Sequence, residues 1–124
     1  VFDFNRKDKN GNLRELHTDL ALDAMDYDKK DDFKVVYDQK SDTVNSMVDC
    51  PYFKTNFLQL DNNLSLDVKA RSSFTILMCV GGSAEIVTNA GTVAIQKGET
   101  VLLPADSESI SIETSGVKLL EVTV

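Results

Sequence analysis

The second half of the chain consists of short apolar or alternating runs. From residue 74 to residue 124, glycine, proline, asparagine or serine separates each run from the next. Short runs punctuated in this way are typical of antiparallel strands that close a sandwich or a barrel. The longest apolar run, residues 74–80, has the length of a strand, whereas a helix needs roughly 20 apolar residues to span a bilayer. The sequence therefore predicts a mostly β fold and no membrane helix.

Size, charge and cysteine usage restrict the function further. The chain has 124 residues, enough for one domain, and a formal net charge of -7. Such a charge repels the phosphates of nucleic acids, so we expect no nucleic-acid partner. Cys50 and Cys79 lack a Cys-x-x-Cys spacing, which favours free thiols in a reducing compartment. With the acidic surface, this predicts a cytoplasmic location. Because the chain starts at Val1, without a methionine or a signal segment, we expect an internal cut in a longer protein.

A short helix is predicted near the start of the chain. Thr18 is a suitable N-cap residue, and the helix is expected to end near Tyr27. Its apolar side chains recur at helical spacing on one face, and its aspartates lie mostly away from that face. We expect this face to pack on the barrel. The apolar side chains are those of Leu20, Ala21, Ala24 and Met25.

The chain is predicted to divide into a linker and a barrel. Residues 1–32 form the linker segment, which carries the helix, and residues 33–124 form the β-barrel. Residues 33–37 are predicted to be an edge strand, in which Lys34 would discourage pairing with another chain. The pattern thus places a mostly β domain after a short helical segment.

Two details of the barrel also follow from its residues. The glycine pair Gly81 and Gly82 is predicted to end the strand at residues 74–80, because glycine supplies backbone freedom that a Cβ restricts. Three glutamates are spread over different strands, and we expect them to face solvent. These glutamates are Glu85, Glu99 and Glu121.

Several stretches resemble a known family. Gly98, five residues and Pro104 resemble the glycine-proline half of the second cupin motif. Residues 3–6, Asp-Phe-Asn-Arg, and residues 10–17, Asn-Gly-Asn-Leu-Arg-Glu-Leu-His, resemble the segment that follows the catalytic cupin of class I mannose-6-phosphate isomerases. Residues 50–53, Cys-Pro-Tyr-Phe, and the C-terminal strands are similar to the second, smaller cupin of the short bacterial form. The resemblance covers nearly all of the chain and implies a cupin-like jelly roll with one short N-terminal helix.

This resemblance implies a role within a larger enzyme. Enzymes of this family interconvert mannose 6-phosphate and fructose 6-phosphate, and a zinc ion is held in their first cupin. The zinc ligands and the family's active-site arginine would lie upstream of Val1, so no catalytic residue is assigned in this chain. The resemblance implies a non-catalytic C-terminal domain that stabilises the catalytic cupin, borders its cleft and is inactive alone. Its expected partner is that catalytic cupin, and the expected ligand of the whole enzyme is a sugar phosphate.

The residues at the expected metal positions differ from a cupin metal site. Such a site needs histidines and a glutamate. Ser109 lies near the place of the expected last histidine, Asp106 takes the place of the expected glycine, and His17 is the only imidazole. We therefore expect no metal ligand and no cofactor in this chain.

Three residues near the start are candidates for substrate binding or for a domain interface. Arg6 and Arg14 could meet a phosphate, and His17 could face the mouth of the active site. The alternatives are surface ion pairs for the arginines and a packing or capping role near the helix start for His17.

Two further functions remain open from the sequence. A free-standing, metal-free cupin could bind a small polar ligand, such as a sugar, inside its barrel. A metal-loaded cupin could instead use carboxylates such as those of Asp106 and Glu113. Residues alone do not decide between these alternatives and the domain of a larger isomerase.

Overall fold

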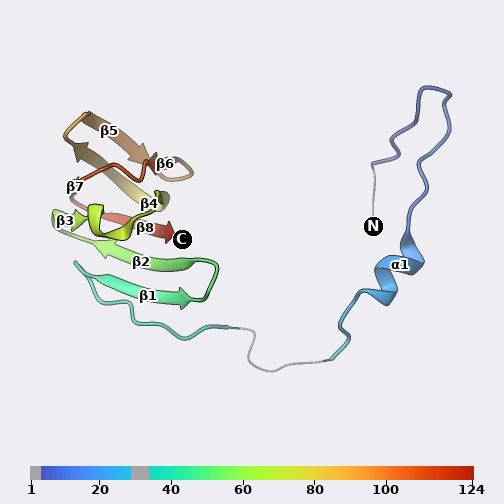
Figure 1. The fold of residues 1–124 in the computed structure, drawn as a ribbon, viewed down its shortest axis with the longest axis horizontal. Coiled ribbons are helices and arrows are strands. Elements are labelled where there is room, and N and C mark those ends of the chain that lie inside the picture. The colour runs from blue at the N-terminus through green and yellow to red at the C-terminus, as the bar shows by residue number, and fades with distance from the viewer. Residues whose placement is uncertain (1–3, 29–33) are drawn as a thin grey trace. The chain divides into compact units, whose positions relative to one another are not determined.

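The computed structural model describes residues 4–28 and 34–124 (Figure 1). These residues belong to two units, which we call the N-terminal unit (residues 4–28) and the β unit (residues 34–124). No helix in the described ranges is long and apolar enough to cross a membrane. The predicted mostly β architecture with one short α-helix is confirmed.

The N-terminal unit contains the predicted helix in a shortened form. Helix α1 spans Thr18–Asp23, and its N-cap residue is His17, which makes no capping side-chain hydrogen bond. The hydroxyl of Thr18 instead donates to the Leu16 carbonyl at 3.2 Å, so the predicted Thr18 cap is wrong. The helix also ends well before Tyr27. Its last turn carries no basic residue to interact with the negative end of the helix dipole, which favours an early end.

The N-terminal unit also contains a turn at Asn10 and Gly11, two residue types that are typical of turns. The Asp8 carboxylate accepts hydrogen bonds from the backbone amides of Asn12 at 2.9 Å and Asn10 at 2.8 Å. These bonds lower the pKa of Asp8 below its ordinary value, with the Asn12 amide contributing most. All residues of α1 are described and none is buried, and the predicted packing of its apolar face on the barrel stays a prediction.

The described part of the β unit forms an eight-stranded antiparallel sheet that curls into a half-barrel. Its strands fall into two parts, which we call the large sheet and the small sheet and which share β4. The large sheet contains β1, β2, β8, the first half of β4 and β6, and the small sheet contains β5, the second half of β4, β7 and β3. A single turn of 3-10 helix, η1, lies between β3 and β4. The bounds are β1 Val44–Asp49, β2 Lys54–Leu60, β3 Leu64–Asp67, η1 Lys69–Arg71, β4 Thr75–Thr88, β5 Gly91–Gln96, β6 Thr100–Leu103, β7 Ser109–Glu113 and β8 Val117–Thr123.

Strand β4 joins the two sheets, because it runs through both. The predicted end of a strand at Gly81 and Gly82 is therefore wrong, and the glycines mark a bend within one long strand. Gly82 has φ +73°, and a Cβ there would lie 2.1 Å from the carbonyl oxygen of Gly116. Only glycine satisfies both the positive φ and this close backbone approach. A register shift between Cys79 and Gly81 adds to the bend.

The predicted edge strand at residues 33–37 is absent from the described residues 34–37, and Phe33 lies outside the described ranges. Residues 34–40 run without regular structure to a single parallel bridge between Ser41 and Gln59. The Tyr37 ring packs edge-on against Phe57, with ring centroids 5.8 Å apart and an interplanar angle of 68°. Tyr37 thus covers part of the outer face of the large sheet instead of extending its edge.

The hydrophobic core lies between the inner faces of the two sheets. Alternate residues of each strand point inward, as the period-2 pattern predicts, and several are fully buried. The core holds Leu58, Leu60, Leu66, Val68, Leu77, Cys79, Ala84, Ile86, Ile95, Leu103, Ile110, Ile112, Val117 and Leu119.

Candidate functional site

A buried carboxylate lies among these core residues. The inward positions of β8 alternate through Leu119, Glu121 and Thr123, and the Glu121 side chain is 0% exposed. The prediction that Glu121 faces solvent is therefore wrong. The alternation that places Leu119 in the core also places Glu121 there, because residues two apart lie on one face of a strand. The sequence held this signal, since Glu121 lies two residues after a core leucine.

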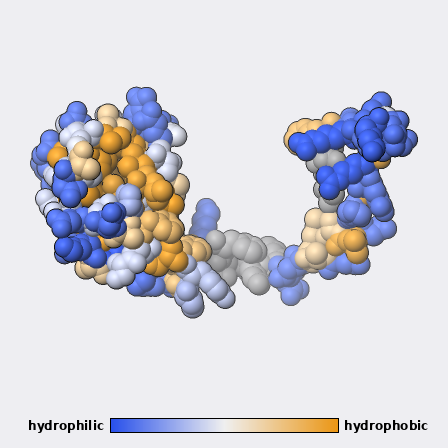
Figure 2. Space-filling model, turned by 45° about the horizontal axis from the view of Figure 1, so that its top comes forward, coloured by the Kyte–Doolittle hydropathy of each residue, from blue (hydrophilic) through white to orange (hydrophobic). Residues whose placement is uncertain are grey.

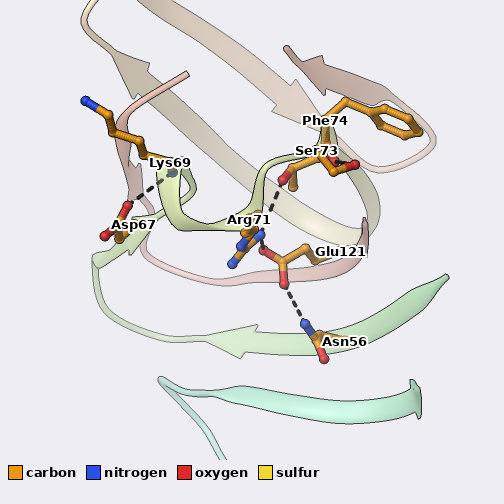
Figure 3. Close-up of polar contacts among 8 residues, drawn as sticks. Asn56, Asp67, Lys69, Arg71, Ser73, Phe74 and Glu121 are labelled. Atoms are coloured by element: carbon orange, nitrogen blue, oxygen red, sulfur yellow. Dashed lines mark hydrogen bonds and ion pairs between the residues drawn. The ribbon is translucent and has the colours of Figure 1, made fainter. Parts of the chain in front are cut away.

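Arg71 neutralises this carboxylate. Figure 3 shows Arg71 reaching from η1 toward β8, where its Nη1 forms an ion pair with Oε1 of Glu121. The Arg71 side chain is 22% exposed, so the pair lies just below the surface of the barrel. Ser72 follows with φ +54°, an uncommon conformation for a residue with a Cβ, and it ends η1 at this point.

Two more side chains complete the cluster. The second carboxylate oxygen of Glu121 accepts a hydrogen bond from Nδ2 of Asn56 on β2 at 2.7 Å (Figure 3). Nη1 of Arg71 also lies 3.4 Å from the hydroxyl of Thr75 on β4. Each oxygen of Glu121 thus has a donor, as a buried carboxylate requires. We call Asn56, Arg71, Thr75 and Glu121 the interior cluster.

The loop that carries Arg71 is tied to the loop before β7. The backbone amides of Val68 and Lys69 donate to the carbonyl of Glu108, at 3.0 and 3.1 Å. Nζ of Lys69 also pairs with the Glu108 carboxylate at 3.1 Å. The Lys69 amide additionally donates to Asp67 at 3.1 Å (Figure 3). These contacts fix the backbone from which Arg71 enters the barrel.

The fold class invites a test of whether the interior fits a zinc ion. A structural or catalytic zinc takes three or four ligands from cysteine, histidine and carboxylate side chains. Within residues 4–28 and 34–124, no group of three or more such side chains could hold a metal ion. The thiol of Cys79, which is buried, donates to two backbone carbonyls at 3.4 and 3.5 Å. Glu121 already has a guanidinium at one oxygen, and this positive charge would repel a cation. The interior donors therefore do not fit zinc.

The sequence-predicted site residues lie in the N-terminal unit. Arg6, Arg14 and His17 are exposed, and Nδ1 of His17 lies 4.0 Å from a carboxylate oxygen of Glu15. His17 also caps α1 through its backbone position. Their proposed contact with substrate or with another domain stays a prediction.

The acidic residues considered as metal ligands are not brought together. Asp106 lines a groove at the open side of the barrel, whereas Glu113 lines a different groove on the outer face of the small sheet. Glu113 lies directly opposite Glu85 in the register of β7 and β4. Glu85 and Glu99 are exposed, as predicted.

The groove at the open side of the barrel has a volume of about 450 Å³. Strands β5 and β6 both pair with β4 but not with each other, so the barrel is open between them. Val93 faces inward opposite the core residue Ile86, yet it is 52% exposed because of this opening. Asp106 and Ser107 lie at the polar rim. An apolar floor with a few polar groups is a common arrangement for small-molecule sites.

Comparisons with known proteins identify the family. The model for the mannose-6-phosphate isomerase cupin domain matches residues 43–122. The chain belongs to this family. It is also 24% identical over 106 residues to the mannose-6-phosphate isomerase ManA of Bacillus subtilis, which covers 84% of this chain and 33% of ManA. The putative mannose-6-phosphate isomerase YvyI of the same organism is 28% identical over 115 residues, which covers 91% of this chain and 36% of YvyI. The chain thus spans about a third of the length of these relatives.

Solved structures confirm the cupin fold. The crystal structure of the B. subtilis mannose 6-phosphate isomerase matches 99% of this chain and 38% of its own, with a TM-score of 0.66 and 24% identity. A cupin-2 domain protein from Shewanella frigidimarina matches 68% of this chain and 81% of its own, with a TM-score of 0.56 and 9% identity. At these identities the likeness concerns the fold alone. The predicted cupin-like body of this domain family is confirmed.

Proposed function

We propose that this chain is the non-catalytic C-terminal cupin of a zinc-dependent mannose-6-phosphate isomerase. In this role it stabilises the catalytic cupin and borders its cleft, and the zinc ion and the catalytic residues belong to that other domain. Membership of the isomerase cupin family supports the proposal, as does the match to only about a third of the relatives' length.

The interior cluster is the observation that carries the proposal. An enzyme that moves a proton between neighbouring carbons of a sugar needs a polarising group and a base near the substrate. In this barrel the buried carboxylate of Glu121 is engaged by Arg71 and Asn56. A carboxylate held in this way serves packing and specificity of the fold better than proton transfer, since it is buried and each of its oxygens already accepts from a fixed donor. Arg6, Arg14 and His17 are the residues of this chain that we propose for the interface or the edge of the cleft.

An activity assay tests the proposal. The purified chain is incubated with mannose 6-phosphate, with and without added zinc, and fructose 6-phosphate is measured. We expect no turnover above the uncatalysed rate. Turnover that disappears after chelation and returns with zinc would contradict the non-catalytic role. The double variant Arg71→Met/Glu121→Leu provides the control, because it removes the buried charges together and any activity that depends on the barrel interior should change with it.

The open groove supports a second candidate function, the binding of a small polar ligand. Sugars present both apolar faces and hydroxyl groups, which suits the floor at Val93 and the rim at Asp106 and Ser107. Titration with mannose, followed by amide chemical shifts, tests this candidate. Saturable shifts confined to β5, β6 and the loop after β6, and lost in Asp106→Ala, would favour a free-standing binding module over the isomerase domain.

A further inference from the structure

The outer face of the large sheet is apolar over three neighbouring strands. On β4, Ile76 and Met78 point away from the core, because Thr75, Leu77 and Cys79 point into it. Ile76 lies directly opposite Leu102 of β6 and Val122 of β8, and Met78 lies opposite Leu120 of β8. We call Ile76, Met78, Leu102, Leu120 and Val122 the apolar outer face.

The corresponding face of the small sheet is polar. Outward positions there include Ser83 and Glu85 on β4 and Ser111 and Glu113 on β7. A sheet with one solvated face normally alternates in this way. Part of the large sheet departs from that pattern, since five outward residues of β4, β6 and β8 are apolar, although Thr100 of β6 and Lys118 of β8 also face outward. Apolar residues on both sides of a strand are usual in sheets that are covered on both faces. Figure 2 shows orange atoms gathered in a broad band on the β unit.

The chain itself covers the part of the outer face near β1 and leaves the part near β6 exposed. Tyr37 lies against Phe57 on β2, toward the edge formed by β1. Toward the opposite edge, Leu102 is 62% exposed. The five side chains of the apolar outer face lie in two rows on three strands about 4.8 Å apart, and the rows are about 6.6 Å apart along the strands, so the patch covers roughly 160 Å². A stable interface buries about 800 Å² on each partner, so this patch has the size of an apolar interface centre rather than of a complete interface.

We propose that the apolar outer face is the surface that docks the catalytic cupin domain of a mannose-6-phosphate isomerase, an inference that rests on the proposed function. The relatives carry this domain within chains about three times as long, so a second domain accompanies it in the same polypeptide. The polar outer face of the small sheet offers no comparable apolar centre. A second copy of this chain is a poorer occupant, because each copy carries a net charge of -7 and two such copies repel one another.

A binding experiment with matched substitutions tests the inference. The probe is the part of B. subtilis ManA that precedes the segment matching this chain, and its Kd for the full 124-residue chain is measured by calorimetry. Leu102→Lys places a charge on the apolar outer face at an exposed position, and Ala94→Lys places the same charge at an exposed position on β5. We expect Leu102→Lys to raise the Kd at least ten-fold and Ala94→Lys to change it less than two-fold. Leu102→Ser tests the same position without adding a charge, and we expect it to raise the Kd as well.

The outcomes separate this inference from the proposed function. Equal binding by the parent chain and both Leu102 variants overturns the docking face and leaves the proposed function standing. A chain that dimerises, and becomes monomeric with Leu102→Lys, assigns the face to a second copy and also overturns the inference. Absence of any binding to the ManA probe contradicts both proposals. Urea unfolding of each variant shows whether the substitution left the β unit folded, and a misfolded variant is replaced by Leu102→Ser.

Discussion

The two halves of strand β4 differ in what their outward side chains require. In the first half Ile76 and Met78 point outward, and in the second half Ser83 and Glu85 do so, while both halves point apolar residues into the same core. Strand β4 therefore belongs to the large sheet, where it carries apolar residues on both faces, and to the small sheet, whose outer face is mainly polar. The difference teaches that inward packing explains the fold of both halves but not the apolar outward residues of the first half, for which we propose a docking partner.

Substitutions in the interior cluster, beside the first half of β4, should have the largest effect on the unfolding free energy. Arg71→Met leaves the Glu121 carboxylate buried and without its counter-charge, which costs about 3–5 kcal/mol of unfolding free energy. The double variant Arg71→Met/Glu121→Leu should recover most of this loss, because no buried charge remains. Urea unfolding measures both.

Lys69→Met is the matched control, since the Lys69–Glu108 pair is exposed and should contribute at most about 1 kcal/mol. A loss below about 1 kcal/mol in Arg71→Met would show that the interior pair contributes no more than a surface pair.

The bend between the two halves gives the next effect. Gly82→Ala forces a Cβ toward the Gly116 carbonyl and a residue with a side chain into positive φ. Left-handed strain of about 1–2 kcal/mol and overpacking of about 1–3 kcal/mol together predict a loss of roughly 2–5 kcal/mol. At Gly91, φ is +140° but no atom lies within 4 Å of an added Cβ. Gly91→Ala should therefore lose less unfolding free energy than Gly82→Ala, because the overpacking contribution is absent. Equal losses at the two glycines in thermal unfolding would count against the close approach.

The polar face of the second half contains a smaller, unfavourable interaction. Glu85 and Glu113 lie directly opposite one another on neighbouring strands, and like charges so placed repel. Glu113→Thr should therefore stabilise the β unit by about 0.2–1 kcal/mol at low salt. At about 1 M salt the Debye length falls to about 3 Å, so most of this gain should vanish. A gain that persists in salt would point to β propensity of threonine rather than to charge.

The turn beside the large sheet predicts the smallest effect, which depends on pH. The Asp42 carboxylate accepts hydrogen bonds from the side-chain amide of Asn62 at 2.8 Å and from the backbone amides of Asn62 at 2.9 Å and Asp61 at 2.8 Å. These bonds lower the pKa of Asp42 below the ordinary value of 3.8, with the Asn62 side chain contributing most. The stabilisation is complete above the unfolded pKa and is lost as the pH falls through the lower folded pKa.

Asp42→Asn should accordingly be less stable than the parent chain near neutral pH, and the difference should shrink as the pH falls below 3.8. Chemical denaturation at a series of pH values measures this. A difference that is constant from neutral pH to acid would disprove the role of the ionised carboxylate.

Much of the fold was predictable because local patterns and tertiary packing agree. The alternation of Leu64, Leu66 and Val68 with polar residues is typical of a half-buried strand, and β3 forms there. Residues 88–91 contain the asparagine and glycine of a tight turn, and they join β4 to β5. The sequence did not predict that β4 continues through Gly81 and Gly82, because a glycine pair is equally compatible with the end of a strand. Residues 34–37 have strand-like composition, but in the structure they form no strand and the Tyr37 ring packs on Phe57, a long-range contact that local composition does not encode.

The interior cluster was harder to predict than the fold. The period of β8 placed Glu121 inward, but nothing local linked it to Arg71, which lies fifty residues earlier in η1. Arg71 reaches the carboxylate through a three-residue 3-10 turn and a left-handed Ser72, and neither has a strong sequence signature. The candidates found from sequence, Arg6, Arg14 and His17, belong to the N-terminal unit, and their roles remain proposals.

The central claim is that Arg71, rather than a metal ion, neutralises Glu121 within the barrel. The most direct test is to incubate the chain with excess zinc, remove unbound metal by gel filtration and determine the zinc content by elemental analysis. The account predicts far less than one zinc per chain, and the same low value for Glu121→Gln. One zinc retained per parent chain, and lost on Glu121→Gln or Cys79→Ser, would contradict it.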